Sequence, residues 1–394
     1  MKKVVSTERI PIKMWLDDLE DSALDQAKNL ANLPFSCKHI VILPDSHMGA
    51  GVPIGSVVAT QGIVIPNSVG RDISCGVLAI KFNKLVEEID ITTLKKIMGN
   101  IRKEVPMGLN QKHDDPLPEE LMPEYKYLDD TPIVKREWLN ARKSLKSLGS
   151  GNHFFELQKD TEGYLWVMIH SGSRNLGSKV ADHYDKIAKK LNEKYFSKVD
   201  PKQELAFLLM DTEEGQTYWK EMNYCMLFAE QNRLLMGQAA CNIINNFISL
   251  PTSCGVRSIG ISHNYAAYEN HFGTNYIVHR KGAIRAKDGE LGIVPGSQGS
   301  KSYITKGLGN VESFESSSHG AGRTMSRSKA KKQLNLADEI KILDDQGIIH
   351  GMRQNTDLDE AVSAYKDINI VMENQKDLTE IFIELSPIAS MKGQ

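Results

Sequence analysis

The chain has no excess of basic residues. Its 394 residues carry 48 Lys plus Arg against 50 Asp plus Glu, a formal net charge of −2. Bulk, charge-driven adhesion to nucleic acid or to an anionic membrane needs a surplus of Lys and Arg, so any site for a polyanion must be local. With 41% hydrophobic and 25% charged residues, the composition is that of a globular protein and excludes disordered, collagen-like and coiled-coil classes.

Long hydrophobic runs and disulfide frameworks are also missing. No stretch of about 18 consecutive apolar residues is available to span a membrane, and the opening MKKVVSTERIPIKMW lacks the apolar centre of a secretory signal. The cysteines are few, odd in number and scattered, which does not indicate a disulfide framework; they are Cys37, Cys75, Cys225, Cys241 and Cys254. The reducing cytoplasm is therefore the predicted compartment.

Three common nucleotide signatures are absent as well. The sequence contains no GxxxxGK[ST] phosphate loop and no GxGxxG after a strand. The KxDG motif of enzymes that attack nucleotides with a lysine is also missing. If this chain activates a nucleotide, its nucleophile is a different residue.

The first third of the chain predicts a helix followed by strands. Apolar residues recur at helical spacing over residues 17–33. Two β-branched runs follow, His39–Leu43 and Val57–Ile65, and each is closed by a proline, Pro44 and Pro66 respectively.

The rest of the chain mixes helices and short strands. Residues 105–133 are rich in Pro and charge and predict a polar surface insertion, Trp138–Leu148 predicts a helix, and 211–248 predicts one long helix. Short strands are expected at 256–261, 276–280 and 303–305. This mixed order favours an α+β fold over a regular βαβ repeat.

Histidine placement is the most informative feature of the sequence. Several of the 11 histidines follow predicted strands or stand beside glycine, where a backbone and a ligand can approach closely. They are His47 in PDSHMGAG, His153 in GSGNHFFE, His170 in VMIHSGSR, His263 in ISHNY and His319 in SSSHGAGR.

Three of these histidines combine with RDISCG to give a candidate metal site. A thiolate, a carboxylate and three imidazoles suit a borderline divalent ion such as Mn²⁺, Zn²⁺, Fe²⁺ or Co²⁺; the set is Asp72, Cys75, His153, His170 and His263. Five ligands exceed one tetrahedral site, and a thiolate bridging two ions would use them all. The alternative is that these are scattered structural polar residues.

A second group of residues is suited to binding phosphates. HSGSRNLG places Arg174 close after His170, and HGAGRTMSRSKAKK places Arg323 and Arg327 after His319. Arginine forms bidentate bonds with phosphate oxygens, and glycine-rich turns such as PGSQGSKS expose N–H donors. The three lysines at the end of the second motif are equally consistent with a solvated helix face.

Taken in order, the motifs resemble those of the RtcB family of RNA ligases. The resemblance rests on PDSHMGAG, VGRDISCG, GSGNHFFE, HSGSRNLG, SHNY, HFG, RKGA, PGSQGSKS, GLGN, SSSHGAGRTMSR, YKDI and MKG, which span residue 44 to the C-terminus. It implies one catalytic domain over residues 1–394. The implied fold is α+β, with a mixed β-sheet or sandwich core that holds the metals, flanked by helices that include one long one.

The resemblance also implies roles for individual residues. Cys75 is expected to bridge two Mn²⁺ ions that Asp72, His153, His170 and His263 complete, and His319 to attack the α-phosphate of GTP and carry GMP. Arg174, Arg323 and Arg327 are expected to hold RNA phosphates. The expected nucleotide contacts are Asn152, Phe154, Glu156, Pro295, Ser297, Ser302, Gly320, Ala321, Gly322, Tyr365 and Lys392.

The implied reaction has three steps and RNA repair or tRNA splicing as its setting. A 2′,3′-cyclic phosphate is opened to a 3′-phosphate, GMP moves from His319 onto it, and a 5′-hydroxyl displaces GMP. A monomer is expected, and the sequence leaves open whether an activating or repair protein takes part.

The match is incomplete near the expected metals and nucleotide. Six residues differ from those usual in the family: Ala50 replaces lysine, Ser46 and Arg71 each replace valine, Ser74 replaces glycine, Ser262 replaces histidine and Gln298 replaces methionine. These changes indicate a divergent paralogue. Two rival functions remain, a binuclear metal phosphodiesterase and a catalytically silent RNA-binding protein, and covalent GMP on His319 would distinguish the ligase from both.

Overall fold

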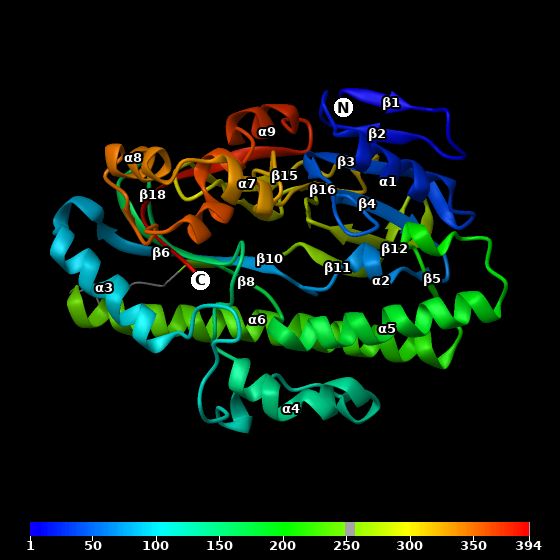
Figure 1. Ribbon diagram of the computed structural model, residues 1–394, viewed down its shortest axis with the longest axis horizontal. Helices are drawn as coiled ribbons and strands as arrows, with labels where there is room; N and C mark the ends of the chain where they lie inside the picture. The colour runs from blue at the N-terminus through cyan, green and yellow to red at the C-terminus, as the bar shows by residue number, and fades with distance from the viewer. Residues whose placement is uncertain (249–256, 394) are drawn as a thin grey trace.

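The computed structural model describes residues 1–248 and 257–393 and has a mixed fold built on two large sheets (Figure 1). The six-stranded sheet contains, in spatial order, β1 (Lys3–Val5), β2 (Ile12–Met14), β3 (Ser36–His47), β4 (Ile54–Thr60), β12 (Thr274–Lys281) and β11 (Asn264–His271). The larger sheet runs through β10 (Arg257–Ser262), β6 (Gly76–Leu85), β8 (Tyr164–Ser171), β7 (Phe154–Asp160), β18 (Thr379–Lys392), β15 (Ser302–Gly307) and β14 (Leu291–Val294), with β17 (Ile349–His350) beside β18.

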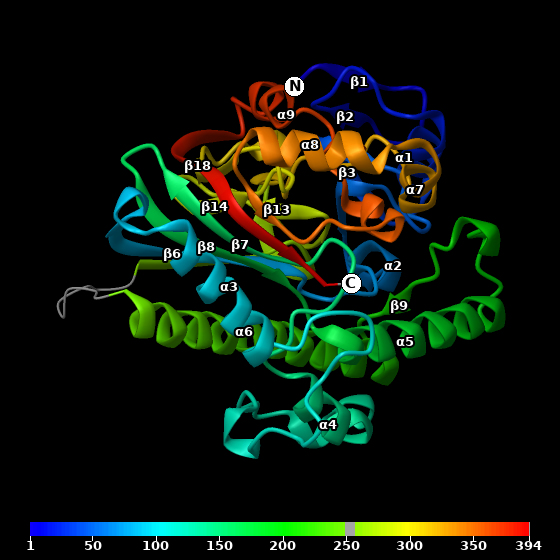
Figure 2. The same ribbon diagram turned by 60° about the vertical axis from the view of Figure 1, so that its left-hand side comes forward.

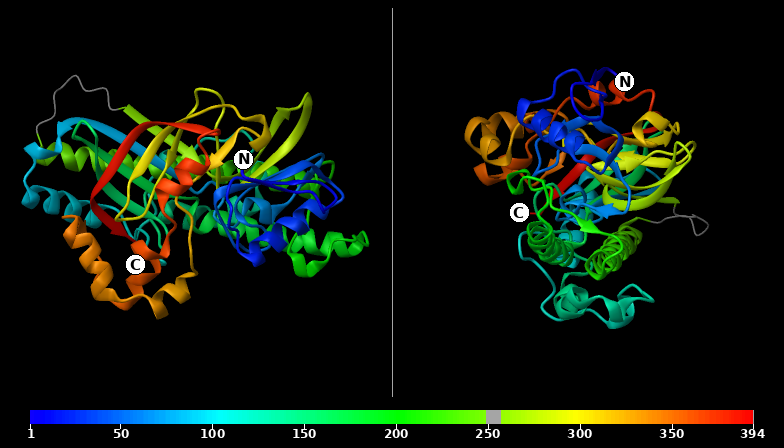
Figure 3. Two further views of the ribbon diagram at one scale, coloured as in Figure 1. Left: turned by 90° about the horizontal axis from the view of Figure 1, so that it is seen from above. Right: turned by 90° about the vertical axis from the view of Figure 1, so that its right-hand side faces the viewer.

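Helices surround these sheets. They are α1 (Asp21–Asn32), α2 (Pro66–Val69), α3 (Ile91–Glu104), α4 (Pro132–Ser144), α5 (Arg174–Lys194), α6 (Glu213–Phe247), α7 (Arg327–Gln333), α8 (Leu336–Asp345) and α9 (Ile368–Asn374). Figure 2 shows α5 and α6 side by side beneath the sheets, and Figure 3 shows α4 projecting beyond them. The predicted α+β class is confirmed.

Two small ladders contain the remaining strands of the described residues: β13 (Ala283–Arg285) pairs with β16 (Ser316–Ser318), and β5 (Ile63–Val64) pairs with β9 (Leu208–Leu209). Among the described residues, none of the helices is long and apolar enough to cross a membrane. Cys254 and the first residue of the strand expected at 256–261 lie outside the described residues.

The predicted long helix is confirmed as α6. The Thr212 side chain accepts a hydrogen bond from the Gly215 N–H and so caps its first turn. Tyr218, Met222 and Phe228 are fully buried against α4 and α5 in one core cluster. Burial of this apolar face, rather than helix propensity alone, stabilises a helix of 35 residues.

The expected strand boundary at Pro44 is wrong, whereas the strand before Pro66 does end there, since β5 stops at Val64 and Pro66 begins α2. β3 continues through Pro44 to His47 because its pairing with β4 is irregular between Ile42 and His47, and a proline fits where no ladder N–H is required. The run expected over 57–65 is two strands, β4 and β5, separated by a turn at Gly62 with φ +65°.

The helix expected over 138–148 is α4, which begins six residues earlier, at Pro132, and ends earlier, at Ser144. Pro132 occupies its first turn, where a missing N–H costs nothing, and Lys146 lies beyond its end at φ 57°. Before it, residues 105–131 form loops with two short 3₁₀ turns, Glu119–Leu121 and Leu128–Asp130, whose backbone is mostly near the surface.

Four neighbouring strands bring the expected metal ligands to one edge of the large sheet. The edge is fixed by register, since Gly76 at the start of β6 pairs with Ser171 at the end of β8 and with Ser262 at the end of β10. Phe154 at the start of β7 pairs with His170. Residues that begin or end these antiparallel strands therefore gather in space, although they come from distant parts of the chain.

Candidate functional site

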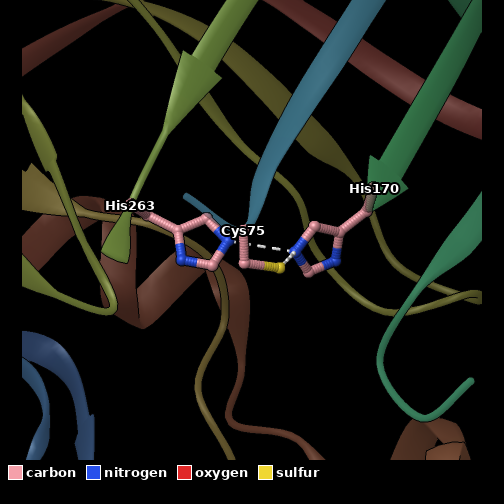
Figure 4. Close-up of side chains that lie close together, drawn as sticks. All are labelled: Cys75, His170 and His263. Carbon is pink, nitrogen blue, oxygen red and sulfur yellow. Dashed lines mark hydrogen bonds between the residues drawn. The ribbon is translucent and has the colours of Figure 1, made fainter. Parts of the chain in front are cut away.

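The side chains expected to bind metal converge at this sheet edge. Cys75 Sγ lies 3.3 Å from His153 Nε2 and 3.2 Å from His170 Nε2. His153 Nε2 is 2.9 Å from Asp72 Oδ2, and His170 Nε2 is 3.0 Å from His263 Nε2. Figure 4 shows Cys75, His170 and His263 pointing toward one another from three strand ends.

The outer nitrogen of each imidazole faces an oxygen acceptor. His153 Nδ1 is 2.8 Å from the Leu148 carbonyl oxygen, and His170 Nδ1 is 3.0 Å from the Asn152 carbonyl oxygen. His263 Nδ1 is 3.3 Å from Asn264 Oδ1. For His170 and His263, which have no carboxylate hydrogen-bond partner among the described residues, an outward Nδ1–H leaves the Nε2 lone pairs facing inward.

Such a set of converging lone pairs requires a cation. Two acceptor nitrogens at 3.0 Å from each other, with a sulfur beside them, repel one another unless a positive ion lies between them. Burial lowers the pKa of His170 and of His263 well below the ordinary value, which opposes protonation as a substitute for the ion. The residues present therefore fit a metal centre.

The acidic members of the set have opposite pKa shifts. Burial raises the pKa of the Asp72 carboxyl, but hydrogen bonding to His153 outweighs it and brings this pKa to about 2. Burial, with Asp72 nearby, raises the pKa of the Cys75 thiol well above its ordinary value. A divalent cation in contact with the sulfur is what would convert the thiol to a thiolate.

The ligand atoms form two overlapping groups. One contains Cys75, His170 and His263, the other contains Asp72, Cys75 and His153, and within each group the atoms lie within 4.8 Å of one another. Cys75 belongs to both. This arrangement is the one expected of a sulfur shared by two ions.

Two residues of α6 support the loops that carry these ligands. Asn232 Nδ2 donates to the Ser147 and Gly172 carbonyls, at 3.1 and 3.3 Å. Buried Arg233 donates through Nη1 to the carbonyls of Ser74 and Ser171, both at 2.9 Å. Sequence reasoning missed this pair, which stands within an apolar helical stripe.

His319 is held by Asp45, which sequence reasoning also missed. His319 Nδ1 lies 2.6 Å from Asp45 Oδ2, and the backbone N–H of His319 donates to the same oxygen at 3.1 Å. Asp45 is fully buried, and although burial raises the pKa of its carboxyl, the electrostatic attraction and hydrogen bond from His319 outweigh it and the pKa is lowered. The motif PDSH contains Asp45, so its place beside His47 was the available signal.

A cavity of about 830 Å³ opens over His319. Eight of the expected nucleotide contacts line it: Asn152, Phe154, Pro295, Gly320, Ala321, Gly322, Tyr365 and Lys392. His47 also lines it, and burial lowers the pKa of this imidazole to about 4. The cavity therefore offers a neutral imidazole, two aromatic rings and glycine-rich backbone. Such groups are suited to binding the base and the phosphates of a nucleotide.

The other three expected nucleotide contacts, Glu156, Ser297 and Ser302, lie buried beside this cavity without lining it. Glu156 faces Ser390 across the β7–β18 ladder, and its carboxylate accepts hydrogen bonds from Ser390 Oγ at 2.9 Å and from Gln158 Nε2 at 2.8 Å. Burial raises the pKa of Glu156.

The arginines expected at RNA phosphates differ in how many donors they have free. Arg323 donates to Glu360, to Met325 O and to Asp359 O, which commits most of its N–H groups. Within the part of the chain that the structure describes, Arg327 donates through Nε alone, to Glu360 at 3.0 Å, and half of its side chain is exposed. Arg174 donates to Ser147 Oγ at 3.1 Å at the start of α5.

Glu360 is a further residue that the sequence did not reveal. Its buried carboxylate contacts Arg323, Arg327 and Tyr365, and Lys392 Nζ is 4.0 Å away. This one anion therefore fixes several of the cationic and phenolic groups around the cavity.

A second cavity, of about 800 Å³, adjoins the first at His319. The ligands Asp72, Cys75 and His263 line it together with residues of α2 and α5. The two cavities share Ile54, Asn152, His319 and Arg327, and their other lining residues differ.

Comparison with known proteins identifies the family. The model of a family described as "tRNA-splicing ligase RtcB" matches residues 26–393. The chain is 37% identical to the RNA-splicing ligase RtcB of Escherichia coli K12, over 99% of each chain. It is 32% identical to the tRNA-splicing ligase RtcB of Nanoarchaeum equitans and 30% identical to that of Thermococcus kodakarensis, over 98% of this chain and 95% of each relative. The chain belongs to the RtcB family.

Proposed function

We propose that this chain is an RNA ligase for RNA repair or tRNA splicing. It joins a 2′,3′-cyclic phosphate or 3′-phosphate end to a 5′-hydroxyl end through GMP carried on His319. The contact between His319 Nδ1 and buried Asp45, next to two overlapping metal-ligand groups, is the observation that carries the proposal. The printed names of the relatives, RNA-splicing and tRNA-splicing ligases, support the same reaction class.

His319 is the nucleophile of the first step. Because Nδ1–H donates to Asp45, the lone pair is on Nε2, and the carboxylate stabilises the imidazolium charge that develops as Nε2 reacts. Nε2 bonds to the α-phosphorus of GTP, and the bond from that phosphorus to the bridging oxygen breaks. Pyrophosphate leaves and GMP remains on His319 as a phosphoramidate.

Two Mn²⁺ ions are the proposed metals. Cys75, His170 and His263 would hold one, and Asp72, Cys75 and His153 the other, with the Cys75 sulfur shared. The mixture of sulfur, nitrogen and oxygen donors suits a borderline ion. When bound, such ions supply positive charge that offsets charge building on the reacting phosphate.

The first cavity is the proposed nucleotide site. Phe154 and Tyr365 offer aromatic surface to the base, and the backbone of Gly320, Ala321 and Gly322 offers N–H donors to phosphate oxygens. Glu156 has lone pairs left beyond its bonds to Ser390 and Gln158 and would accept from guanine N1–H and its amino group. Pro295, Ser297, Ser302, Asn152 and Lys392 complete the proposed contacts.

The RNA steps follow from the same centre. Water opens the cyclic phosphate to a 3′-phosphate, and an oxygen of this phosphate bonds to the phosphorus of GMP as the bond to His319 Nε2 breaks. The 5′-hydroxyl oxygen then bonds to the phosphorus of the 3′-phosphate, loses its proton and releases GMP. Arg174, Arg323 and Arg327 are the proposed phosphate contacts, with Arg327 having the most donors free.

We further propose that residues 1–394 act as one catalytic domain, as a monomer, in the cytoplasm. The described cysteines Cys37, Cys75, Cys225 and Cys241 are free thiols, which fits a reducing compartment.

The test is the intact mass of the protein after incubation with GTP and Mn²⁺. One added GMP is expected, and none with ATP or with a chelator. The His319→Ala variant, otherwise folded, should gain no mass. A phosphodiesterase or a silent RNA-binding protein would form no adduct under any of these conditions.

A further inference from the structure

The second cavity extends from the metal ligands along one face of α5. Asp182, Asp185, Lys186 and Lys189 line it. Their spacing of three and four residues places them in one stripe along the helix. Arg71 and Asn67, from the segment around α2, also line it and contact α5: Arg71 pairs with Asp182, and Asn67 Nδ2 donates to Asp185 Oδ1 at 3.3 Å.

Apart from the candidate metal ligands, the charged side chains that line this cavity are predominantly cationic. The cations are Arg71, Lys186, Lys189, Lys281 and Arg327, and the carboxylates other than Asp72 are Asp182, Asp185 and Glu204. Arg71 pairs with Asp182 and Lys189 with Asp185, both at 2.7 Å. Among the described residues, Lys186 has no carboxylate within ion-pair distance and is exposed.

The chemistry of the sealing step assigns the two cavities to different substrates. A displacement at phosphorus is in line, so the attacking oxygen approaches from the side opposite the leaving group. The leaving group is GMP, which occupies the first cavity. The 5′-hydroxyl must therefore arrive from outside the first cavity. The second cavity offers that approach, because it holds the candidate metal ligands and adjoins the first cavity at Asn152 and His319.

We propose that the second cavity binds the RNA strand that carries the 5′-hydroxyl end, with Lys186 and Lys189 contacting its backbone phosphates. This inference rests on the proposed ligase function and adds the path of one strand. Exposed lysines on one helix face are point charges suited to a flexible phosphate backbone and carry no base preference.

The positions of the two lysines along α5 set their distance from the candidate metal site. The helix starts at Arg174, and the Ser173 N–H donates to Asp72 Oδ1 at 3.2 Å, so this end lies at the metal site. Lys186 and Lys189 follow at about 18 and 22 Å, at 1.5 Å per residue. At about 3.4 Å per nucleotide of a stacked strand, they reach phosphates roughly five to seven nucleotides from the 5′ end.

The experiment compares two double variants of the same helix. Lys186→Ala with Lys189→Ala removes the lysines that line the cavity, and Lys190→Ala with Lys194→Ala removes two exposed lysines that do not line it. The probe is a ten-nucleotide 5′-hydroxyl RNA with fluorescein on its 3′-hydroxyl end. Its dissociation constant is measured by anisotropy over a range of KCl concentrations without GTP, so the result does not depend on adduct formation.

The cavity variant should bind the ten-nucleotide probe more weakly, and its slope of log affinity against log salt should fall by about 0.7 per lost phosphate contact, or about 1.4 in all. A three-nucleotide 5′-hydroxyl probe should bind both variants equally. In sealing assays, the KM for the long 5′-hydroxyl strand should rise while the rate of GMP transfer to a 3′-phosphate strand stays the same.

Three results would overturn the proposal: an unchanged salt slope in the cavity variant, an equal loss in the Lys190 and Lys194 variant, or an equal loss for the three-nucleotide probe. A rise in KM for the 3′-phosphate strand alone would assign the cavity to the other substrate and also overturn it. Failure of the unaltered protein to form the GMP adduct would instead count against the proposed function.

Discussion

His319 and Asp45 are joined by two hydrogen bonds to one carboxylate oxygen, at 2.6 Å from Nδ1 and 3.1 Å from the backbone N–H. Asp45 belongs to β3 of the six-stranded sheet, whereas the metal ligands lie at the edge of the larger sheet. The rings of His263 and His319 are only 4.5 Å apart between centroids. The candidate nucleophile and the candidate metal centre are thus positioned by different sheets and meet between them.

Asp45→Asn should slow formation of the GMP adduct by about 10²- to 10⁴-fold, because an amide neither stabilises the imidazolium nor fixes the tautomer. Metal content should not change, since Asp45 is outside both ligand groups. Single-turnover labelling with GTP measures the rate. Asp18→Asn is the matched control, because Asp18 lines the same cavity without bonding to His319; equal rates in the two variants would contradict the role given to Asp45.

Cys75→Ser should lose both metal ions together, since its sulfur belongs to both ligand groups and a serine hydroxyl stays protonated. Removal of a shared ligand should weaken Mn²⁺ binding by at least about 100-fold. Metal analysis after dialysis, with circular dichroism to check folding, is the measurement. Cys241→Ser, at a half-buried thiol away from the site, should keep its metal. Retention of one full equivalent by Cys75→Ser would disprove the shared sulfur.

Much of the site could be predicted because its residues stand at strand ends. Cys75 and His153 directly precede strands, His170 is next to last in one, and His263 lies between two. In a sequence, a β-branched or apolar run next to a glycine-rich turn marks such positions. Their residue types then indicated the metal chemistry. What the sequence does not contain is the strand register that gathers them, which depends on pairing between segments up to nearly 200 residues apart.

The missed residues share a different property. Asp45 is 274 positions from His319, and Glu360 meets Arg323 and Arg327 only through the packing of α7 against the segment that follows α8. Arg233 stands in an apolar stripe of α6, where one polar residue indicates no particular partner. Such residues acquire their role from long-range contacts, which local periodicity does not encode.

Glu156→Gln should reduce adduct formation from GTP by about 10- to 100-fold, because a glutamine amide cannot accept both guanine N–H donors, and an unpaired donor costs about 1–3 kcal/mol. Labelling rates with GTP and with ATP measure the change in preference. Glu162→Gln, at an exposed residue just beyond the same strand, should label as the unaltered protein does. Equal labelling of the unaltered protein by ATP and GTP would remove Glu156 from guanine recognition.

Glu269 should make the fold sensitive to acid. Burial raises the pKa of its carboxyl, but the charge of Arg280 and the bond to His271 outweigh it and bring the pKa to about 2. Since this folded-state pKa is depressed, the stabilisation is present above about pH 4.5 and is lost as pH falls toward 2. The shift corresponds to roughly 3 kcal/mol. Glu269→Gln should lower the free energy of unfolding at pH 7 and flatten its decline between pH 4.5 and 2, measured by urea denaturation; an unchanged acid profile would contradict this account.

His319→Ala should separate nucleotide chemistry from metal and RNA binding. The five candidate metal ligands remain, so the variant should hold its metal, yet adduct formation should fall by at least about 10⁴-fold because the attacking nitrogen is gone. Supplied with RNA whose 3′ end already carries the guanylate, the variant should still seal it to a 5′-hydroxyl strand, since only displacement of GMP remains. Gel analysis of the joined product measures this step. Failure to seal with metal content intact would mean that His319 also serves the last step, and GMP-sized mass on the variant would exclude it as the nucleophile.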